Sequence, residues 1–446
     1  MDSNDIPPPR PRNARLALLL TMLPVASVRG LEVGGRLLCF GLAAILLPPA
    51  ALASFFLMLA WLSLASAVAR LGLDRAATRH VAAALSRGDR AEAGRAVRLA
   101  LLLSAAGTII LGGFTLLASG EVARLMPDFP GLAGALLVCA AILPGYTMAA
   151  VVAGALVGCS RAGLAQLVQF TLWPWALIVA LGLGVRSVEA MLGVLGLVQA
   201  VAGFAGLWAA RLPLAGGAGV AGGAGVAGSA GAPPRNAGTP ALARAMLRSG
   251  APMLGLDLVN LGLVNLPLLA LAQYGTPAEV AGFGLALRMF QLPWTLVTSI
   301  ASLLAPRFAA AHASGDMAAL RQANRQGLRL ARMTALPATV LLLLAPGFWL
   351  GLFGAEFTVA GPALGLLALA QLANAGWALQ DTLLGMTGHG RALRHILLAQ
   401  GATCLLASAI LVPWLGLIGA ALAVALPLLV GVLGCLAASR RLLPGV

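Results

Sequence analysis

Apolar runs of about 20 residues alternate with short polar segments along the whole chain. A run of this length, wound as a helix, crosses the hydrocarbon core of a bilayer. We therefore predict an all-α integral membrane protein with about twelve transmembrane helices. The predicted spans cover residues 20–46, 50–70, 97–118, 132–156, 164–184, 190–210, 249–272, 282–305, 333–353, 361–385, 393–412 and 416–438.

A segment rich in Gly, Ala and Pro, "AGGAGVAGGAGVAGSAGAPPRNAGTP", separates the sixth predicted span from the seventh. It has no hydrophobic periodicity, and this composition is typical of a flexible linker. The chain is therefore predicted to form two six-helix lobes, residues 1–210 and 244–446, joined by a cytoplasmic linker over residues 211–243.

Composition supports a membrane class and argues against several others. The chain is 60% hydrophobic and only 10% charged, which does not suit a soluble protein of 446 residues. The net charge of +15 does not indicate nucleic-acid binding, because the arginines are divided among short loops. The sequence contains no lysine, which excludes a Walker-type phosphate loop. Neither the five cysteines nor the four histidines cluster, so we expect no metal and no cofactor.

Arginine placement predicts the orientation. Of the 29 arginines, 24 lie in the tails, the linker and alternate loops, two (Arg124 and Arg186) lie in the opposite loops, and three (Arg29, Arg36 and Arg288) lie within spans. Positive loops remain in the cytoplasm, so both termini are predicted to be cytoplasmic in a multi-pass protein of a bacterial inner membrane. The first span is interpreted as one long helix, bent near Pro24 or Gly30; a cleaved signal segment is the alternative.

An internal repeat appears when the sequence is aligned with itself so that Gly88-Asp89 meets Gly315-Asp316. "SRGDRAEAGRAVRLA" (86–100) then aligns with "ASGDMAALRQANRQG" (313–327), and at the same offset "LVGCSRAG" (156–163) aligns with "LLGMTGHG" (383–390). Because each half has an even number of spans, the two repeats run parallel. Parallel repeats place a substrate site at their interface near the membrane midplane, so we predict a transporter with a central cavity.

Several stretches carry a resemblance to a known family. "GLDRAATRHVAAALSRGDRAEAGRAVRLALLL" (72–103), "LRMFQLPWTLVTSIASLLAPRFAAAHASGDMAALRQ" (287–322), "LFGAEFTVAGPALGLLAL" (352–369) and "LVPWLGLIGAALAVAL" (411–426) resemble the polysaccharide-unit (O-antigen type) flippases. That family belongs to the multidrug/oligosaccharidyl-lipid/polysaccharide exporter superfamily.

The resemblance implies a flippase, not an enzyme, that moves a polyprenyl-pyrophosphate-linked oligosaccharide from the inner to the outer leaflet for surface polysaccharide biosynthesis. It implies the lipid-linked oligosaccharide and the bilayer as partners, and names a polysaccharide polymerase and export machinery as further candidates. The drug-exporting branch usually shows G-Q-x-x-G-A after the first helix, where this chain reads "LLPPAALASFF". An ion-coupled multidrug or small-molecule exporter of the same superfamily remains the alternative. A membrane glycosyltransferase would need a larger extramembrane loop.

Polar side chains concentrate on one face of the span at 282–305. At about 100° per residue, its polar residues fall within an arc of about 100°, and they are Arg288, Gln291, Thr295, Thr298, Ser299 and Ser302. A charge at membrane depth is costly, so this face is predicted to line the cavity. Adhesion between helices is the alternative reading of such a face.

Three other spans carry polar faces. The first span holds Arg29, Glu32 and Arg36, the seventh Asp257 and Asn260, and the tenth Gln371, Asn374 and Asp381. A salt-bridged ladder at the cytoplasmic interface is an alternative for the first of these. We also consider that Arg288 pairs permanently with Asp257 and only holds two helices together. Arginine's fork of donors fits phosphate oxygens, whereas a carboxylate can carry a coupling ion. The predicted substrate-binding residues are Arg288, Arg36, Arg29, Gln291, Thr295, Asn260 and Asn374, and the predicted ion-coupling residues are Asp257 and Glu32.

Overall fold

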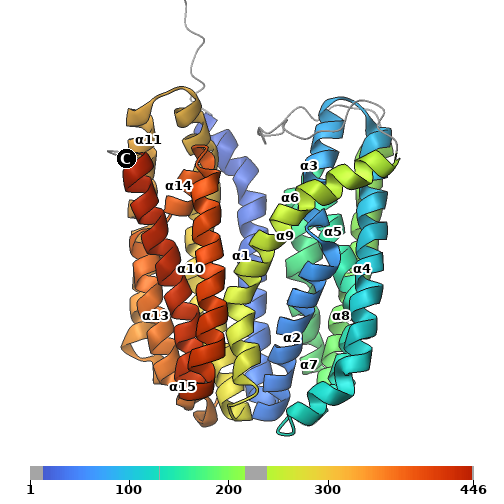
Figure 1. Ribbon diagram of the computed structural model, residues 1–446, viewed down its shortest axis with the longest axis vertical. Helices are drawn as coiled ribbons and strands as arrows, with labels where there is room; N and C mark the ends of the chain where they lie inside the picture. Colours follow the sequence, from blue (N-terminus) through green and yellow to red (C-terminus); the bar gives the residue numbers. More distant parts are fainter. Residues whose placement is uncertain (1–13, 130, 216–238, 444–446) are drawn as a thin grey trace, which may run out of the picture.

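The structure is a computed structural model that describes residues 14–129, 131–215 and 239–443. Every regular element in this part of the chain is helical, and the helices form two lobes side by side (Figure 1). Among the described residues, ten helices are long and apolar enough to cross a membrane, by length and composition. Large apolar side chains face outward, with Leu117 and Trp414 each 86% exposed. The predicted fold class is confirmed.

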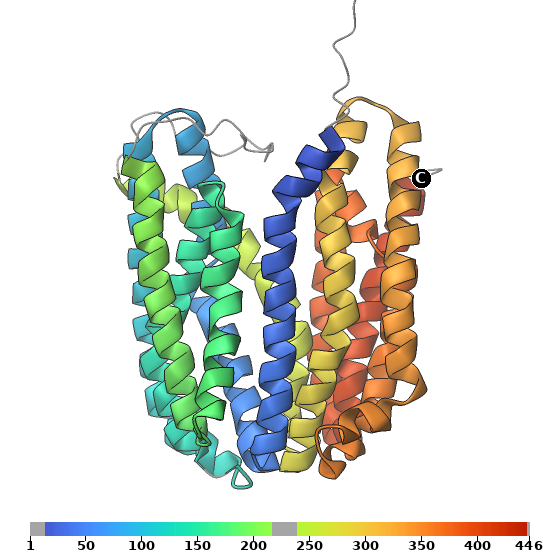
Figure 2. The same cartoon turned by 180° about the vertical axis from the view of Figure 1, so that it is seen from behind.

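The first lobe contains eight helices and one π-helical turn among the described residues. They are α1 (Ala14–Leu46), α2 (Pro49–Arg70), α3 (Leu73–Ser86), α4 (Arg90–Leu125), α5 (Leu132–Gly158), α6 (Ala162–Gln166), the π-turn η1 (Leu167–Thr171), α7 (Leu172–Gly182) and α8 (Val188–Ala215). Helix α1 is continuous, as predicted, and bends in its upper part in the view of Figure 2.

The second lobe has the corresponding order of elements. It contains α9 (Thr239–Leu271), α10 (Pro277–Ala313), α11 (Met317–Leu344), α12 (Pro346–Gly351), the 3-10 turn η2 (Ala355–Ala360), α13 (Gly361–Gly376), α14 (Gln380–Met386) and α15 (Gly390–Leu442). Helix α15 folds back at Gly416, whose φ is 53° and ψ is −124°. The amide of Gln400 then donates to the Pro427 carbonyl at 3.1 Å. The ten candidate membrane helices do not include α1, and they count α15 once. With α1 added and α15 counted as two spans, the total agrees with the prediction of about twelve.

The two lobes show the predicted repeat in local detail. Asp89 caps α4 by accepting from the Glu92 amide at 2.8 Å, and Asp316, its aligned counterpart, caps α11 by accepting from the Ala319 amide at 2.8 Å. The glycine before each cap has a positive φ, which a residue without Cβ adopts readily. The aligned Gly-Asp pairs are therefore the same helix start in both repeats.

The repeats differ where α2 meets α3. The self-alignment that pairs Asp89 with Asp316 superposes α2 and α3 together on α10, yet α10 is one continuous helix. In the first lobe the chain breaks at Leu71 and Gly72, which have φ values of 52° and 71°. The sequence prediction treated residues 71–96 as a loop and did not anticipate α3.

Glycines hold this α2–α3 corner against its neighbours. A Cβ at Gly107 of α4 would collide with the Ala69 carbonyl, and one at Gly154 of α5 with the Asp74 carbonyl. A Cβ at Gly72 would collide with the Gly250 carbonyl of α9. Because a glycine has no side chain, it allows two backbones to approach this closely. The corner therefore has a defined position between α4, α5 and α9.

Helix α9 contacts both lobes. Near its start, Leu242 and Met246 are fully buried in a cluster with residues of α3, α4 and α5. Farther along, Val259 and Gly262 contact α15 at Gly401 and Cys404. The predicted boundaries, 1–210, 211–243 and 244–446, remain a prediction, and the core of the predicted linker, residues 216–238, lies outside the described residues.

The first turn of α1, helix α3, the start of α11 and the last turn of α15 lie at the same end of the molecule (Figures 1 and 2). This is the arginine-rich end that the sequence assigns to the cytoplasm. The orientation in a particular membrane, and the inner-membrane location, remain predictions.

Candidate functional site

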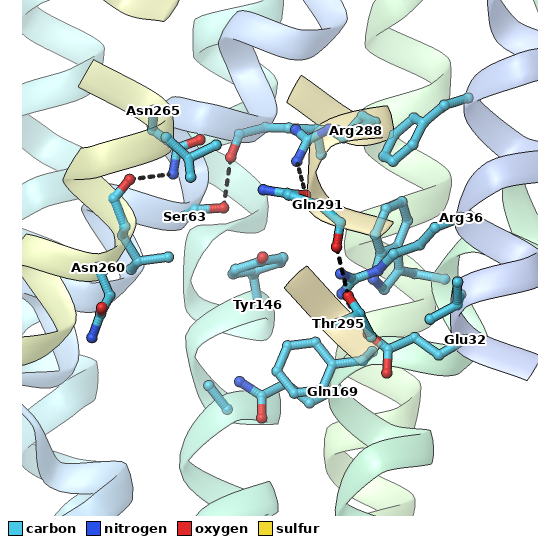
Figure 3. Close-up of a pocket in the computed structure, with 18 of the residues that line it drawn as sticks. Glu32, Arg36, Ser63, Tyr146, Gln169, Asn260, Asn265, Arg288, Gln291 and Thr295 are labelled. Carbon is cyan, nitrogen blue, oxygen red and sulfur yellow. Dashed lines mark hydrogen bonds and ion pairs between the residues drawn. The ribbon is translucent and has the colours of Figure 1, made fainter. Parts of the chain in front are cut away.

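A cavity of about 340 Å³ lies between the lobes. Helices α1, α2, α5, α7 and α8 and the turn η1 line it from the first lobe, but only α9 and α10 line it from the second. The polar side chains in its wall come from seven of these elements, although each element is mostly apolar. Figure 3 shows them converging on one space.

Arg288 projects into this cavity from α10 (Figure 3). The centre of its guanidinium lies 5.0 Å from the ring centre of Phe40 and 5.7 Å from that of Phe56. Its Nη1 donates to Gln291 Oε1 at a long 3.4 Å, while its buried Nε has no acceptor. Among the described residues no carboxylate pairs with it. The aromatic rings therefore cover its faces and leave edge donors for a ligand.

Arg36 is a second cation in the cavity, but it has a counter-charge. Its Nη2 lies 3.2 Å from Glu32 Oε1, one turn earlier on α1. Gln166 donates to the other oxygen of the same carboxylate. The Arg36 guanidinium also lies 5.3 Å from the Phe170 ring centre and 5.7 Å from that of Trp173. Glu32 is thus held on both oxygens.

The π-helical turn η1 shapes this side of the cavity. It adds a residue to the helical turn between α6 and α7, and such turns frequently occur at functional sites. Gln169 and Phe170 within η1, and Trp173 just after it, all line the cavity.

Neutral polar groups line the side of the cavity opposite Arg36 and Glu32, and Arg70, which also lines the cavity, is paired with Asp74 and Asp257. In Figure 3, Asn260, Asn265 and Ser63 lie on the opposite side from Arg36 and Glu32, with Tyr146 of α5 between them. The Asn265 amide donates to the Leu261 carbonyl at 2.9 Å, and Gln199 donates to the Gln169 carbonyl at 3.2 Å. Carboxamides and hydroxyls can both donate and accept hydrogen bonds, so this part suits a ligand rich in hydroxyl groups.

Six of the nine predicted site residues line the cavity. They are Arg288, Arg36, Gln291, Thr295, Asn260 and Glu32. Two of the other three are held elsewhere: Arg29 donates to Thr298 of α10 at 3.4 Å, and Asn374 of α13 donates to Gln371 at 3.4 Å. Helix α13 contributes nothing to the cavity wall, because its polar face turns into the second lobe.

Asp257, the third, lies in an ion-pair cluster at the α2–α3 corner. Its Oδ1 is 2.5 Å from Arg75 Nη2 and its Oδ2 is 3.8 Å from Arg70 Nη2. Arg70 Nε also lies 3.3 Å from Asp74 Oδ2. The suggested permanent pair between Arg288 and Asp257 is therefore wrong for this structure, since Asp257 binds two arginines of the first lobe.

The sequence analysis missed several cavity residues. Gln199 is the one polar side chain in the span at 190–210 and is 1% exposed. A lone carboxamide in an apolar span is a usable signal, because burying it in lipid is costly. The other missed polar residues are Arg70, Ser63, Tyr146, Gln169 and Asn265.

Several solved structures of transporters have a fold similar to that of this chain. The lipid II flippase MurJ in an inward closed conformation is similar with a TM-score of 0.70 and 12% identity, over 95% of this chain and 87% of that one. An inward-facing multidrug resistance transporter of the MATE family is similar with a TM-score of 0.68 and 18% identity, over 93% of this chain and 98% of that one. A MATE family transporter in the outward-facing conformation is similar with a TM-score of 0.61 and 19% identity, over 95% of this chain and 94% of that one. No protein-family model and no curated protein matches the chain. At these identities the likeness concerns the fold.

Proposed function

We propose that this protein is an alternating-access transporter that flips a polyprenyl-pyrophosphate-linked oligosaccharide from the inner to the outer leaflet. Support for the transporter class comes from the fold, whose neighbours are MATE transporters and MurJ. No covalent step belongs to this proposal, because flipping requires only binding, movement of the lobes and release.

The observation that carries the proposal is the uncompensated charge of Arg288. The cavity wall contains Arg36, Arg70 and Arg288 but one carboxylate, Glu32. Glu32 neutralises Arg36, and Asp74 and Asp257 neutralise Arg70. Arg288 remains, so a bound anion would balance the cavity. A guanidinium binds two phosphate oxygens at once, which makes a pyrophosphate a well-matched anion.

The neutral part of the cavity supports a sugar beside the pyrophosphate. Gln169, Gln199, Asn260 and Asn265 offer donors and acceptors suited to hydroxyl and acetamido groups. Tyr146 lies between Asn260 and Arg36 (Figure 3), where its ring can contact the face of the first sugar. The two ends of the cavity therefore correspond to the two chemical parts of the headgroup.

The volume of the cavity indicates which part of the proposed substrate it can hold. At about 340 Å³ it falls at the small end of ligand pockets, roughly 300–1,000 Å³. A pyrophosphate with its first sugar suits this space, but a long polyprenyl chain does not. In the proposal the chain stays in the bilayer while the headgroup crosses.

A multidrug exporter is the second candidate, favoured by the MATE neighbours and by the aromatic lining of Phe40, Phe170 and Trp173. A carboxylate is the strongest side-chain partner for a cationic drug, and aromatic rings add a smaller contribution. Glu32 is the one carboxylate in the described wall, and Arg36 and Gln166 already occupy it. The charge of the cavity therefore favours an anionic substrate.

A deletion strain distinguishes the two candidates. We expect loss of surface polysaccharide and accumulation of its lipid-linked unit, restored by the wild-type gene but not by Arg288→Ala at equal protein level. Unchanged polysaccharide together with new sensitivity to cationic drugs would contradict the flippase and support the exporter.

A further inference from the structure

The first turns of helix α11 carry a row of arginines that lies outside the cavity. Arg321, Arg325 and Arg329 follow one another at intervals of four residues, so they lie along neighbouring positions of one helix face. Together with Gln322, Gln326 and Ala318 they line a surface hollow of about 520 Å³. All six residues are exposed.

These arginines have no counter-charge in the described part of the chain. None of the three takes part in an ion pair there. The nearby Asp316 is committed to the cap of α11, where it accepts from the amides of Ala318 and Ala319. Arg321 Nε donates to the Met317 carbonyl at 3.1 Å, which leaves its terminal nitrogens available. Three guanidinium groups therefore face outward together.

The same face continues into Arg332, whose guanidinium donates to the Gly376 carbonyl at 2.8 Å, and then into apolar side chains. Met333, four residues after Arg329, is 67% exposed, and the neighbouring Leu330 is 47% exposed. Farther along the helix Leu341 and Leu344 are 52% and 77% exposed. The change from arginine to apolar residues indicates the level where lipid headgroups meet acyl chains.

The first lobe lacks this feature at the equivalent depth. The alignment of the two repeats pairs Arg321 with Gly94, Arg325 with Arg98 and Arg329 with Leu102. Leu102 is 68% exposed, so at the Arg329 position the first lobe presents an apolar side chain. The rule that positive charge stays on the cytoplasmic side explains the arginines in the loops. It does not explain why the row of exposed arginines continues one turn farther along the helix, to Arg329, in the second lobe but not in the first.

We propose that the start of α11 is a binding site for an anionic glycerophospholipid of the leaflet on the arginine-rich side. Arg325 and Arg329, about 6 Å apart along the helix axis, hold the lipid phosphate by charge-assisted hydrogen bonds. Gln322 and Gln326 contact the headgroup hydroxyls, and the acyl chains lie along Leu330 and Met333. The apolar continuation favours a phospholipid over a soluble phosphate. This proposal does not depend on the transported substrate.

Native mass spectrometry of the full chain tests the site, with phosphatidylglycerol and phosphatidylethanolamine as probes. We expect wild type to retain phosphatidylglycerol preferentially, and Arg321→Gln/Arg325→Gln/Arg329→Gln to bind it more weakly by on the order of tenfold or more. The control, Arg391→Gln/Arg394→Gln/Arg440→Gln, removes the same charge from exposed positions of the same lobe.

Four outcomes decide the proposal. Weaker binding of phosphatidylglycerol by the α11 variant, with binding by the control variant unchanged, supports the proposal. Equal binding by wild type and both variants, or an equal loss of binding in both variants, overturns it. Displacement of phosphatidylglycerol by equimolar polyprenyl phosphate would assign the site to another lipid and also overturn it. Unchanged melting temperatures show that any loss does not come from unfolding.

Discussion

Arg288 and Arg36 share a cavity but differ in their electrostatic environment. Arg36 lies 3.2 Å from Glu32, whereas Arg288 has aromatic faces and one long hydrogen bond. An arginine at membrane depth costs about 2.5–3.5 kcal/mol on insertion scales. Contacts with ring faces recover about 0.5–2 kcal/mol. The remaining cost is the physical reason to expect that Arg288 binds an anion.

Substitution of Arg288 should weaken binding of a short-chain polyprenyl pyrophosphate to the purified protein. Loss of a hydrogen bond to a charged group, at about 1.5–3 kcal/mol, corresponds to roughly ten- to a hundredfold in Kd for Arg288→Ala. Arg288→Lys should retain part of the affinity, because it keeps the charge but loses the planar fork. Equal affinity for wild type and Arg288→Ala would remove Arg288 from the site, and the exposed Arg440→Ala is the control.

Glu32 and Asp257 should respond differently when their charge is removed. If an ion gradient drives the cycle, Glu32→Gln, inside the cavity, should lose gradient-dependent transport and keep substrate binding. Asp257→Asn leaves Arg70 without one of its two partners, which we expect to destabilise the α2–α3 corner; breaking a buried pair costs about 3–5 kcal/mol. The measurements are transport with and without a gradient and the melting temperature. Gradient-dependent transport unchanged in both variants would exclude both carboxylates as ion carriers.

The α2–α3 corner is one element in which the two lobes differ, and it contributes to the cavity wall. It places Arg70 in the cavity wall and brings Arg75 to Asp257 of α9. Its neighbours approach through Gly107 and Gly154, whose α-carbons face backbone carbonyls. In the second lobe the aligned positions are Thr334 and Asp381, and α10 is one continuous helix. Close backbone packing therefore fixes a broken helix in one repeat.

Gly107→Ala and Gly154→Ala should each lower the stability of the protein. The added methyl group meets a carbonyl oxygen that cannot move without shifting a helix, and overpacking costs about 1–3 kcal/mol. Gly113→Ala, on α4 with open space around its α-carbon, should be neutral or stabilising by up to about 1 kcal/mol. Thermal unfolding in detergent measures the difference; equal melting temperatures for the three variants would refute the packing argument.

We expect His80 to make the contact between α3 and α9 sensitive to pH. It is 6% exposed, and a ring nitrogen lies 3.4 Å from Ser249 Oγ of α9. Burial lowers the pKa of His80 below its ordinary value; Arg79 lowers it further, Glu92 opposes the shift and Arg87 adds to the lowering. The unfolded chain therefore takes up a proton first, at about pH 6.5. Stability is present above that pH and decreases as the pH falls toward the folded pKa.

We therefore expect the melting temperature to fall between pH 7.5 and pH 5.5, and to fall less in His80→Asn. The exposed His312→Asn is the matched control and should follow wild type. A pH dependence that is the same in wild type and His80→Asn would show that another group is responsible.

At the scale of the whole molecule, the sequence predicted the architecture because a bilayer imposes strong constraints. Span length and the self-alignment of Asp89 with Asp316 were enough to predict about twelve spans and the repeat; the orientation inferred from loop charge remains a prediction. Helical periodicity also placed Arg288, Gln291 and Thr295 on one face, and these three residues line the cavity, whereas Thr298, Ser299 and Ser302 of the same predicted face are not in its wall.

The remainder of the site depends on tertiary packing. Periodicity shows which residues share a face, but not which neighbour that face meets, so Asn374 and Asp257 were assigned to a cavity that they do not line. Likewise Tyr146 and Gln169 come from helices with little polar pattern, and the positive φ at Leu71 follows from contacts with three other helices.

The central claim is that the cavity carries a lipid-linked pyrophosphate headgroup across the membrane by means of Arg288. Its most direct test is a flipping assay in proteoliposomes, with a polyprenyl-pyrophosphate oligosaccharide labelled on the sugar and a quencher that does not cross the membrane. We predict that wild type exchanges the labelled lipid between leaflets and that Arg288→Ala, reconstituted at equal density, does not. Exchange at the same rate by Arg288→Ala, or none by wild type while it transports a cationic dye, would contradict the account.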